Sequence, residues 1–414
     1  MPQQTMNTLA VVFAVAALTP IGVDLLRRWV VVPAVVLEIL LGIVVGPQVL
    51  GLAHDDTIIT FVADVGLALL MFLAGYEIDF ARIRGAPMKL AGMGWLASLV
   101  LGLACGFLVH GFTFASLVVG LALTTTALST LLPILRDAGL LPTAFGVRIL
   151  AIGAFGEFGP IIAIALLLSG QAPAQTAIVL LAFAVITIVV VVIALRQDSG
   201  RMRKLVTTTL GTSVQYAVRI AMFIVVAMLW VANELRLDLL LGAFVAGIVF
   251  RLVLRRSGHD ETELVHGKLE TIAFGVFVPF FFVVSGIRFD LRALLAHPVS
   301  LALVPGFVVL FLLVRGGPLL MLHRHDMPRR ERGDLALLAS TALPLLVVIA
   351  TIGTETHTLP THTAAALVGA GLVTVLVFPL VALRGRRAVD ELEPGDRQPG
   401  GNGARHERSD QRDG

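Results

Sequence analysis

Apolar segments long enough to cross a lipid bilayer as helices recur along almost the whole of this 414-residue sequence. A transmembrane helix needs roughly 20 predominantly apolar residues, because its backbone groups must bond within the segment in lipid. Hydrophobic residues make up 57% of the chain and charged residues 14%. The mean hydropathy of +0.93 is too high for a soluble domain. We therefore expect an all-α polytopic membrane protein.

Breaks between the apolar segments divide the chain into about 13 transmembrane helices. The first segment has no basic region before it and no small-residue cleavage site after it, so we interpret it as a retained helix. The expected spans are residues 7–26, 29–46, 57–75, 88–109, 114–135, 145–169, 174–195, 213–232, 238–254, 268–286, 298–322, 334–352 and 363–383.

Lysine and arginine are distributed unevenly between alternate loops of this topology. Loops assigned to the cytoplasm hold 22 of these residues, and loops assigned to the outside hold only Arg236, Arg288 and Arg292. Cytoplasmic loops carry the excess of positive charge in membrane proteins. We therefore expect a multi-pass protein of the cell membrane with its N-terminus outside and its C-terminus in the cytoplasm.

Residues 1–384 form one membrane transport domain in this interpretation, and residues 385–414 form a disordered cytoplasmic tail without aromatic residues. The basic residues lie in short loops rather than in one patch, which argues against nucleic-acid binding. The sequence has no GxxxxGK[ST] phosphate-binding loop and a single cysteine, Cys105. We therefore expect no ATP hydrolysis, no cofactor and no disulfide framework.

Glu157 is a carboxylate at the middle of the expected span 145–169, about 18 Å from either end. A charge at this depth costs about 2.5–3.5 kcal/mol on insertion scales, so a functional site is the default interpretation. Gly156, Gly159 and Pro160 leave space beside the carboxyl group and loosen the helix. The alternative is a protonated structural carboxyl in a packing seam of small residues.

Arg315 is a second charge within a span, toward the cytoplasmic side of residues 298–322. A guanidinium keeps its charge, so inside a membrane it needs an acidic partner or a water-filled cavity. Glu157 is the partner we expect, and the alternative is that Arg315 snorkels to the cytoplasmic interface. Glu38 also lies deep in a span, where it could support the site or only brace a neighbouring helix.

Two expected spans share a polar pattern, a cluster of small hydroxyl residues followed by proline. The topology runs these spans in opposite directions, as inverted repeats with two crossing discontinuous helices require. Such breaks free backbone groups that can bind ions near the midplane, although Ser and Thr often bond only to their own helix. The residues are Thr124, Thr125, Thr126, Ser129 and Pro133 in the first span, and Ser340, Thr341 and Pro344 in the second.

Four segments spread over the chain carry a likeness to a known family. They are PAVVLEILLGIVVGPQVLGL (33–52), VADVGLALLMFLAGYEIDF (62–80), LLGAFVAGIVFR (240–251) and FFFVVSGIRFDL (280–291). Together they resemble the monovalent cation:proton antiporter superfamily, with its sodium/hydrogen exchanger-like membrane domain, over essentially the whole membrane region. In that family two broken helices cross near an acidic ion-binding residue, and a basic residue of a later span lies close by.

The resemblance implies that Glu157 is the ion-binding acid and that Arg315 is the basic residue, and it suggests a homodimer. The chain departs from the family pattern at both positions. Family members usually carry Asp preceded by Asp, Asn or Gln, whereas Glu157 follows Gly156, so one side-chain ligand is missing. The basic residue is commonly Lys, which can release its proton, and Arg315 cannot. Both departures bear on ion selectivity and stoichiometry.

The function that these observations favour is exchange of Na⁺ or K⁺ for protons at Glu157 by alternating access. Burial favours the protonated carboxyl and a nearby cation favours its charged form, so the acid could titrate at working pH. Hydroxyls of Thr125, Thr126 and Ser129, with carbonyls freed at the breaks, would complete an oxygen site for the metal ion. One titrating carboxylate releases one proton for each cation bound, so exchange would be electroneutral.

Other functions on the same fold stay open at this point. A proton-gated cation channel could use the same acid, and an organic-anion carrier would direct Arg315 toward its substrate. A non-transporting membrane sensor would fit the glycine at position 156. An enzyme is the weakest alternative, because the sequence has no nucleophile and base at a recognisable spacing.

Overall fold

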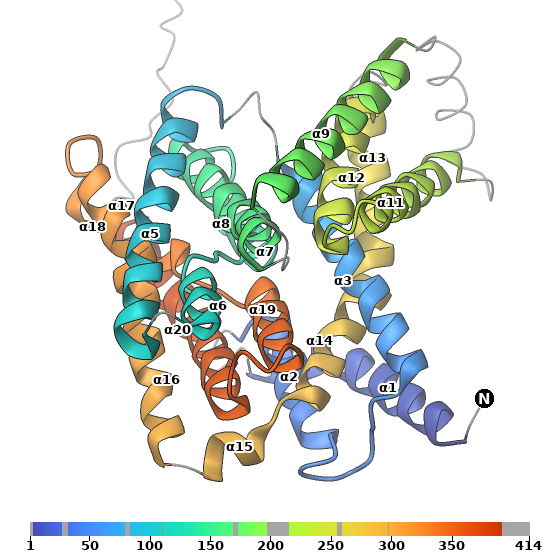
Figure 1. The fold of residues 1–414 in the computed structure, drawn as a ribbon, viewed down its shortest axis with the longest axis vertical. Helices are drawn as coiled ribbons and strands as arrows, with labels where there is room; N and C mark the ends of the chain where they lie inside the picture. The colour runs from blue at the N-terminus through green and yellow to red at the C-terminus, as the bar shows by residue number, and fades with distance from the viewer. Residues whose placement is uncertain are drawn as a thin grey trace, which may run out of the picture.

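The computed structural model consists of helices, and the residues it describes (3–26, 32–78, 83–111, 113–168, 173–196, 215–254, 259–296 and 298–390) form no β-strand. This confirms the all-α fold class (Figure 1). The α-helices are α1 (Gln3–Leu26), α2 (Ala34–Val45), α3 (Thr57–Glu77), α5 (Ala86–His110), α6 (Phe114–Ala122), α7 (Leu128–Asp137), α8 (Ala144–Leu168), α9 (Pro173–Arg196), α11 (Tyr216–Glu234), α12 (Leu239–Leu254), α13 (His259–Ile272), α14 (Val278–Arg288), α15 (Leu291–Ala296), α16 (Pro298–Phe311), α17 (Gly317–Leu322), α18 (Arg329–Ala339), α19 (Pro344–Glu355) and α20 (Thr361–Asp390). Two π-helical turns, η1 (Ala273–Phe277) and η2 (Leu312–Gly316), join α13 to α14 and α16 to α17.

Over the described residues, each expected span overlaps one helix, two helices joined by a π-turn, or two helices separated by a short break, while residues 29–31, 169 and 213–214 of the expected spans lie outside the described part. By length and apolar composition, nine helices in the described part of the chain qualify as spans, or ten if the bent pair α18–α19 is one span. The other expected spans correspond to α2, to α12 and to the pair α6–α7. Helices α2 and α12 are apolar but shorter, and α6 and α7 are each too short to cross a bilayer alone. The count of 13 spans therefore stays a prediction.

The helices pack in two groups, which Figure 1 shows on either side of the molecule. The scaffold group contains α1, α2, α3, α11, α12, α13 and α14, with α3 against α12 and α2 against α14 as its closest pairs. The crossing group contains α5 to α8 and α16 to α20, with α5 against α6 and α16 against α20. Helix α9 contacts both groups through α12 and α8.

Glycine lets the helices of the scaffold group pack backbone against backbone. A side chain at Gly75 of α3 would begin 2.0 Å from the carbonyl oxygen of Phe244, and one at Gly247 of α12 would begin 2.0 Å from that of Phe72. Small residues allow this approach between membrane helices, where van der Waals contact drives association. Two of the four segments that resemble the antiporter superfamily contain these glycines, so part of that likeness reflects helix packing.

Most of the predicted cytoplasmic tail lies outside the described residues. Helix α20 continues through the end of the predicted membrane domain to Asp390, and residues 391–414 are not described. The division of the chain into a membrane domain and a tail therefore stays a prediction.

Candidate ion-binding site

The two broken helices, α6–α7 and α18–α19, meet where their helical hydrogen bonding stops. The amide of Ala127, just before α7, donates to the carbonyl of Thr341 at 2.7 Å. The hydroxyl of Thr126 donates to the carbonyl of Ala339 at 2.6 Å. Buried backbone groups must be paired, and here each break pairs groups of the other. The expected crossing of two discontinuous helices is confirmed.

Most of the hydroxyl groups at the crossing bond to their own helix, which is the alternative that the sequence left open. Thr124 and Thr125 each donate to a carbonyl three residues earlier at 2.8 Å. Ser340 and Thr341 donate to carbonyls four residues earlier, at 2.7 and 3.4 Å. Thr126 differs from these four, because its hydroxyl bonds to the other broken helix.

The two prolines of the pattern occupy different positions relative to the breaks. Pro344 is the first residue of α19, where its missing amide costs no helical hydrogen bond. Pro133 lies within α7, after the break. The side chains of Pro133 and Ser129 are outside the described part of the structure, so the proposed contribution of Ser129 to ion binding stays a prediction.

Arg315 is fully buried in the π-helical turn η2. Its Nε donates to the hydroxyl of Thr126 at 2.8 Å, and its Nη2 donates to the carbonyl of Ile152 in α8 at 2.7 Å. Single π-helical turns are rare and occur frequently at functional sites. The guanidinium therefore joins η2, the first break and α8, and these bonds hold it inside the protein.

Gly156 lies where the first break contacts α8, one residue before Glu157. Its carbonyl accepts a hydrogen bond from the amide of Thr126 at 3.1 Å. A side chain at Gly156 would begin 2.4 Å from Cβ of Thr126 and 2.9 Å from Nη2 of Arg315. The space that a side chain at position 156 would occupy is therefore filled by Thr126 and Arg315.

Glu157 is buried in α8, with 1% of its surface exposed. The neighbouring Phe158 stacks on Phe244 of α12 at 5.1 Å between ring centroids, so this part of α8 also contacts the scaffold group. Glu157, Gly156, Thr126 and Arg315 thus lie in one neighbourhood, although the pairing of Glu157 with Arg315 stays a prediction.

Glu38 belongs to a different neighbourhood. It is buried in α2, with 5% of its surface exposed, and α2 packs mainly on α14 and α1 of the scaffold group. The buried carboxyl therefore lies outside the group of helices that forms the crossing. Bracing of neighbouring helices is the interpretation of Glu38 that this location favours.

One end of the boundary between the two groups is closed by charged side chains. Arg136 of α7 donates to Glu270 of α13 at 3.0 Å and to Glu77, at the end of α3, at 3.4 Å. Nε2 of His266 lies 3.0 Å from the carboxylate of Glu77 and 3.2 Å from that of Glu270. The enclosed space among these helices is only about 20 Å³.

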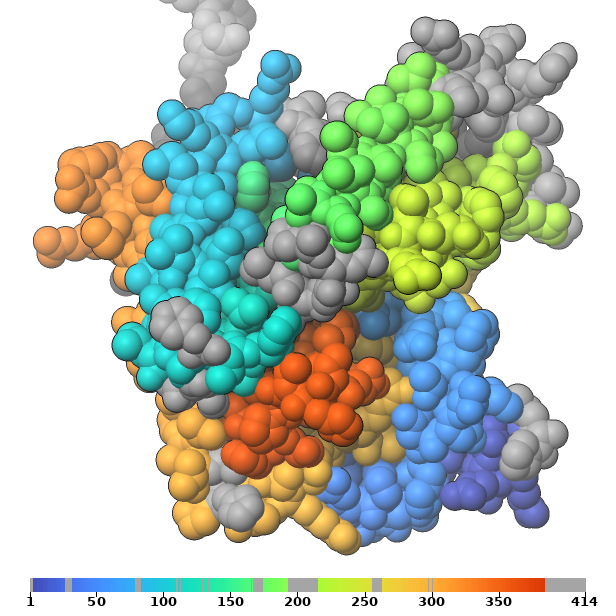
Figure 2. Space-filling view, viewed as in Figure 1, coloured from blue at the N-terminus to red at the C-terminus, as the bar shows by residue number. Residues whose placement is uncertain are grey.

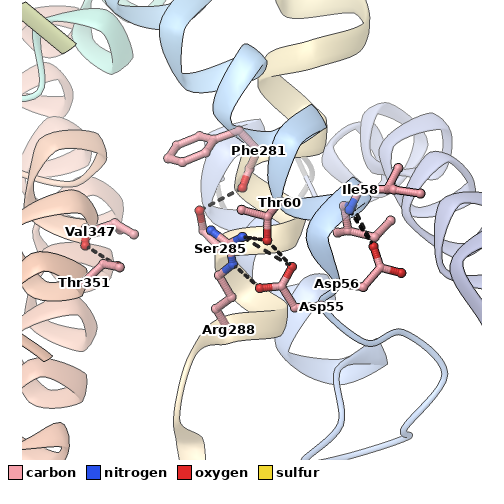
Figure 3. Close-up of polar contacts among 10 residues, drawn as sticks. Asp55, Asp56, Ile58, Thr60, Phe281, Ser285, Arg288, Val347 and Thr351 are labelled. Carbon is pink, nitrogen blue, oxygen red and sulfur yellow. Dashed lines mark hydrogen bonds and ion pairs between the residues drawn. The ribbon is translucent and has the colours of Figure 1, made fainter. Parts of the chain in front are cut away.

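The other end of the boundary is hollow. A cavity of about 990 Å³, lined by α3, α11, α14, α19 and α20, lies between the groups, and Figure 2 shows it between α19 in orange-red and α3 in blue. Figure 3 shows Thr351 of α19 across this gap from Ser285 and Arg288 of α14. Arg288 donates to Asp55 at 2.7 Å and to the hydroxyl of Thr60 at 2.6 Å. Glu157, Thr126 and Arg315 are not among the described residues that line the cavity.

Sequence reasoning missed one polar partner of the second break. Thr374 of α20 accepts a hydrogen bond from the amide of Ala342 at 3.2 Å, which satisfies a backbone group freed between α18 and α19. The available signal was a threonine in the middle of an otherwise apolar span, the same signal that identified Thr126. The cluster of Arg136, Glu77, His266 and Glu270 has no sequence motif, and neither has the cavity. Each joins residues that are far apart in the chain.

The family model for the sodium/hydrogen exchanger transmembrane domain matches residues 13–383. The chain belongs to this family. This agrees with the likeness drawn from the four sequence segments, and it covers all of the expected spans except the beginning of the first.

Three relatives of this exchanger-family chain are named as antiporters, and none of the three as an enzyme. The putative Na⁺/H⁺ antiporter YjbQ of Bacillus subtilis is 26% identical over 92% of this chain, which spans 63% of that relative's length. The probable Na⁺/H⁺ antiporter 3 of Methanocaldococcus jannaschii is 22% identical over 90% of this chain and 95% of its own. The Na⁺/H⁺-K⁺ antiporter GerN of Bacillus cereus is 29% identical over 62% of this chain and 66% of its own.

A solved structure supports the same fold for this member of the family. The sodium proton antiporter MjNhaP1 of Methanocaldococcus jannaschii matches with a TM-score of 0.68, covering 94% of this chain and 99% of that one. Its sequence identity is 15%, so the likeness establishes the fold alone.

Proposed function

We propose that this protein is a secondary active antiporter that exchanges Na⁺ or K⁺ for protons, with Glu157 as the site for which the two compete. The observation that carries the proposal is a buried carboxylate on α8, beside the crossing of two broken helices. A charged group at this depth is functional by default, and the named relatives are cation/proton antiporters.

The charges at this site favour an exchange of one proton for one cation. Arg315 keeps its positive charge whatever the occupant of the site, and Glu157 is the only acid that we assign to it. The carboxylate is neutralised either by a proton or by Na⁺ or K⁺, so the site carries the same charge in both states. Freed carbonyls at the breaks would supply the remaining hard oxygen ligands.

Alternating access is supported by the difference between the two ends of the boundary. The crossing group contacts the scaffold group through Arg136 at one end, and a cavity separates them at the other. The excess of Lys and Arg assigns the closed end to the cytoplasm. We propose that the cavity is the outer half of the ion pathway, and that rocking of the crossing group exposes Glu157 to each side in turn.

The test is dissipation of a pH gradient in proteoliposomes on addition of Na⁺ or K⁺. We expect wild-type flux with at least one of these cations and a loss of at least about 100-fold in Glu157→Gln, because an amide neither releases a proton nor binds a metal ion as a carboxylate does. Glu234→Gln, the same change at an exposed position at the end of α11, serves as a matched control and keeps wild-type flux.

Two outcomes would overturn the proposal. Absence of wild-type flux with either cation, in protein of correct size and helical content, excludes cation/proton exchange and leaves an anion carrier or a sensor. Flux that survives in Glu157→Gln moves the site elsewhere. A net current under an ion gradient would contradict the one-for-one exchange.

We also propose the homodimer that the family resemblance suggests, which the mass of the protein in detergent would test.

A further inference from the structure

One histidine and two carboxylates converge from separate helices at the closed end of the boundary. His266 and Glu270 lie one turn apart on α13 and therefore share one face of that helix. Glu77 reaches them as the last residue of α3. Nε2 of His266 lies 3.0 Å from Oε1 of Glu77 and 3.2 Å from Oε1 of Glu270, and the potential ligand atoms of the three residues all lie within 4.8 Å of one another.

These separations match those between the ligands of one small metal ion. Zn²⁺ binds imidazole nitrogen and carboxylate oxygen at about 2.0–2.2 Å, and tetrahedral geometry then places neighbouring ligand atoms about 3.3 Å apart. Imidazole nitrogen suits Zn²⁺ and other divalent transition metals, whereas Mg²⁺ and Ca²⁺ prefer oxygen ligands. The cluster is therefore suited to a different class of cation from the Na⁺ or K⁺ of the proposed exchange.

Aromatic stacking holds the ring of His266 in one orientation. Tyr76 lies against it with the ring centroids 4.9 Å apart and the ring planes at 17°. The guanidinium of Arg251 in turn lies 5.5 Å from the centroid of the Tyr76 ring. A metal site depends on surrounding groups that orient its histidine, and this stack keeps Nε2 directed at both carboxylates.

The two ring nitrogens of His266 have different surroundings. Nε2 faces carboxylate oxygens, which only accept hydrogen bonds, so it carries a proton in this arrangement. A metal-binding nitrogen must be unprotonated. Nδ1 is buried and has no hydrogen-bond partner in the described part of the structure. Nδ1 can therefore carry the proton of the neutral ring while Nε2 binds a metal ion, without a change in the orientation of the ring.

Arg136 occupies the place that a metal ion would take. Its guanidinium donates to Oε1 of Glu270 and to Oε1 of Glu77, the same two oxygens that face Nε2 of His266. A space of about 20 Å³ beside Arg136 and both carboxylates has room for one water-sized group. Since a guanidinium and a metal ion need the same oxygens and repel each other, they cannot bind there together.

We propose that Glu77, His266 and Glu270 form a binding site for a divalent transition-metal ion such as Zn²⁺, for which Arg136 competes. The three ligands belong to the scaffold group and Arg136 belongs to the crossing group. A bound metal ion would thus release the contact that closes this end of the boundary. The inference goes beyond the proposed exchange, because none of these residues is assigned to the transported ion.

The experiment is calorimetric titration of Zn²⁺ into the full chain in detergent, without an affinity tag. We expect one site whose Kd rises by at least about 100-fold in His266→Gln and in Glu270→Gln, because loss of a group that only orients a ligand already costs about 10- to 100-fold. His357→Gln and Glu234→Gln change exposed residues of the same types elsewhere. Both controls are expected to keep the Kd within about two-fold of wild type.

Arg136→Gln tests the competition directly. We expect Zn²⁺ to bind about 10-fold more tightly, because two part-exposed ion pairs no longer have to be broken and each contributes up to about five-fold. Arg148→Gln is the matched control, since Arg148 is also in the crossing group but pairs with Asp326. Its Kd should be that of wild type. If Arg136→Gln does not fold, Arg136→Met takes its place.

Three outcomes would overturn the proposal. The first is absence of Zn²⁺ binding in both wild type and Arg136→Gln, and the second is binding that survives unchanged in His266→Gln and Glu270→Gln. The third is an equal gain in Arg136→Gln and Arg148→Gln, which would indicate a general attraction for cations. Because the titration needs no transport, a wild type without flux would refute the proposed function and leave the metal site tested independently.

Discussion

The two ends of the boundary between the scaffold and crossing groups differ in how their charged residues pair. At the closed end, Arg136 of the crossing group bonds to Glu77 and Glu270 of the scaffold group, around a space of about 20 Å³. At the open end, Arg288 bonds to Asp55, and both belong to the scaffold side of a cavity of about 990 Å³. Helix α3, of 21 residues, separates these ends by about 30 Å.

This difference indicates that, for holding the two groups together, the position of an ion pair relative to the boundary matters more than its strength. The Arg288 pair is the shorter, at 2.7 Å against 3.0 and 3.4 Å, yet it does not hold the groups together. Exposed pairs contribute about 0–1 kcal/mol each, which is little beside the stability of a domain but enough to shift a balance between two conformations. Arg136 should therefore act on the conformational equilibrium, and Arg288 should not.

The largest effect is expected from Arg136→Glu, which removes two ion pairs and adds a third carboxylate beside Glu77 and Glu270. We expect the free energy of opening at the closed end to fall by about 2 kcal/mol, so that the open state is populated about 30-fold more. Labelling of Ala74→Cys, a buried position lining the small space, reports the opening. The background is Cys105→Ala, and an impermeant maleimide is applied to inside-out vesicles.

The open end supplies the control for this measurement. If the two ends alternate, Thr351→Cys in the large cavity should be labelled more slowly from the outside in Arg136→Glu, whereas Ala74→Cys is labelled faster from the inside. Faster labelling at both positions would indicate loosening of the whole protein, and no change at Ala74→Cys would remove Arg136 from the closure.

An intermediate effect is expected from Glu270→Gln. The amide keeps the shape of the side chain but loses the charge that attracts both Arg136 and His266, while Glu77 still binds Arg136. We expect Ala74→Cys to be labelled about 3- to 5-fold faster, equivalent to about 1 kcal/mol. Glu234→Gln, which changes an exposed carboxylate at the end of α11, should leave the rate unchanged, and 1 M salt should reduce the difference between Glu270→Gln and wild type.

The fold was largely predictable because its strongest determinant is local. Runs of apolar residues and the distribution of Lys and Arg define the helices and their expected order, and two hydroxyl-proline patterns predicted the broken pair that crosses. Helix packing was less predictable, since the close contact of α3 with α12 depends on Gly75 and Gly247. Segment hydropathy does not contain this information.

The candidate site was predictable in its residues and less so in its connections. A carboxylate or guanidinium in an apolar span is conspicuous, so Glu157 and Arg315 could be selected from sequence. Which acceptor the guanidinium reaches depends on how three separate elements meet, and its partners include the backbone of Ile152, which has no side-chain signature. The same reason explains why the sequence could not distinguish Thr125 from Thr126.

The smallest effect is expected at the open end, from Arg288→Gln. The change removes the bonds to Asp55 and Thr60, but all three residues belong to the scaffold group, so no contact across the boundary is lost. We expect labelling of Ala74→Cys and Thr351→Cys to stay within about two-fold of the parent rates, since the pair is part-exposed and contributes at most about 1 kcal/mol. A change in labelling rate comparable to that of Arg136→Glu would contradict the difference drawn between the two ends. It would mean that ion pairs within one group also control the opening of the boundary.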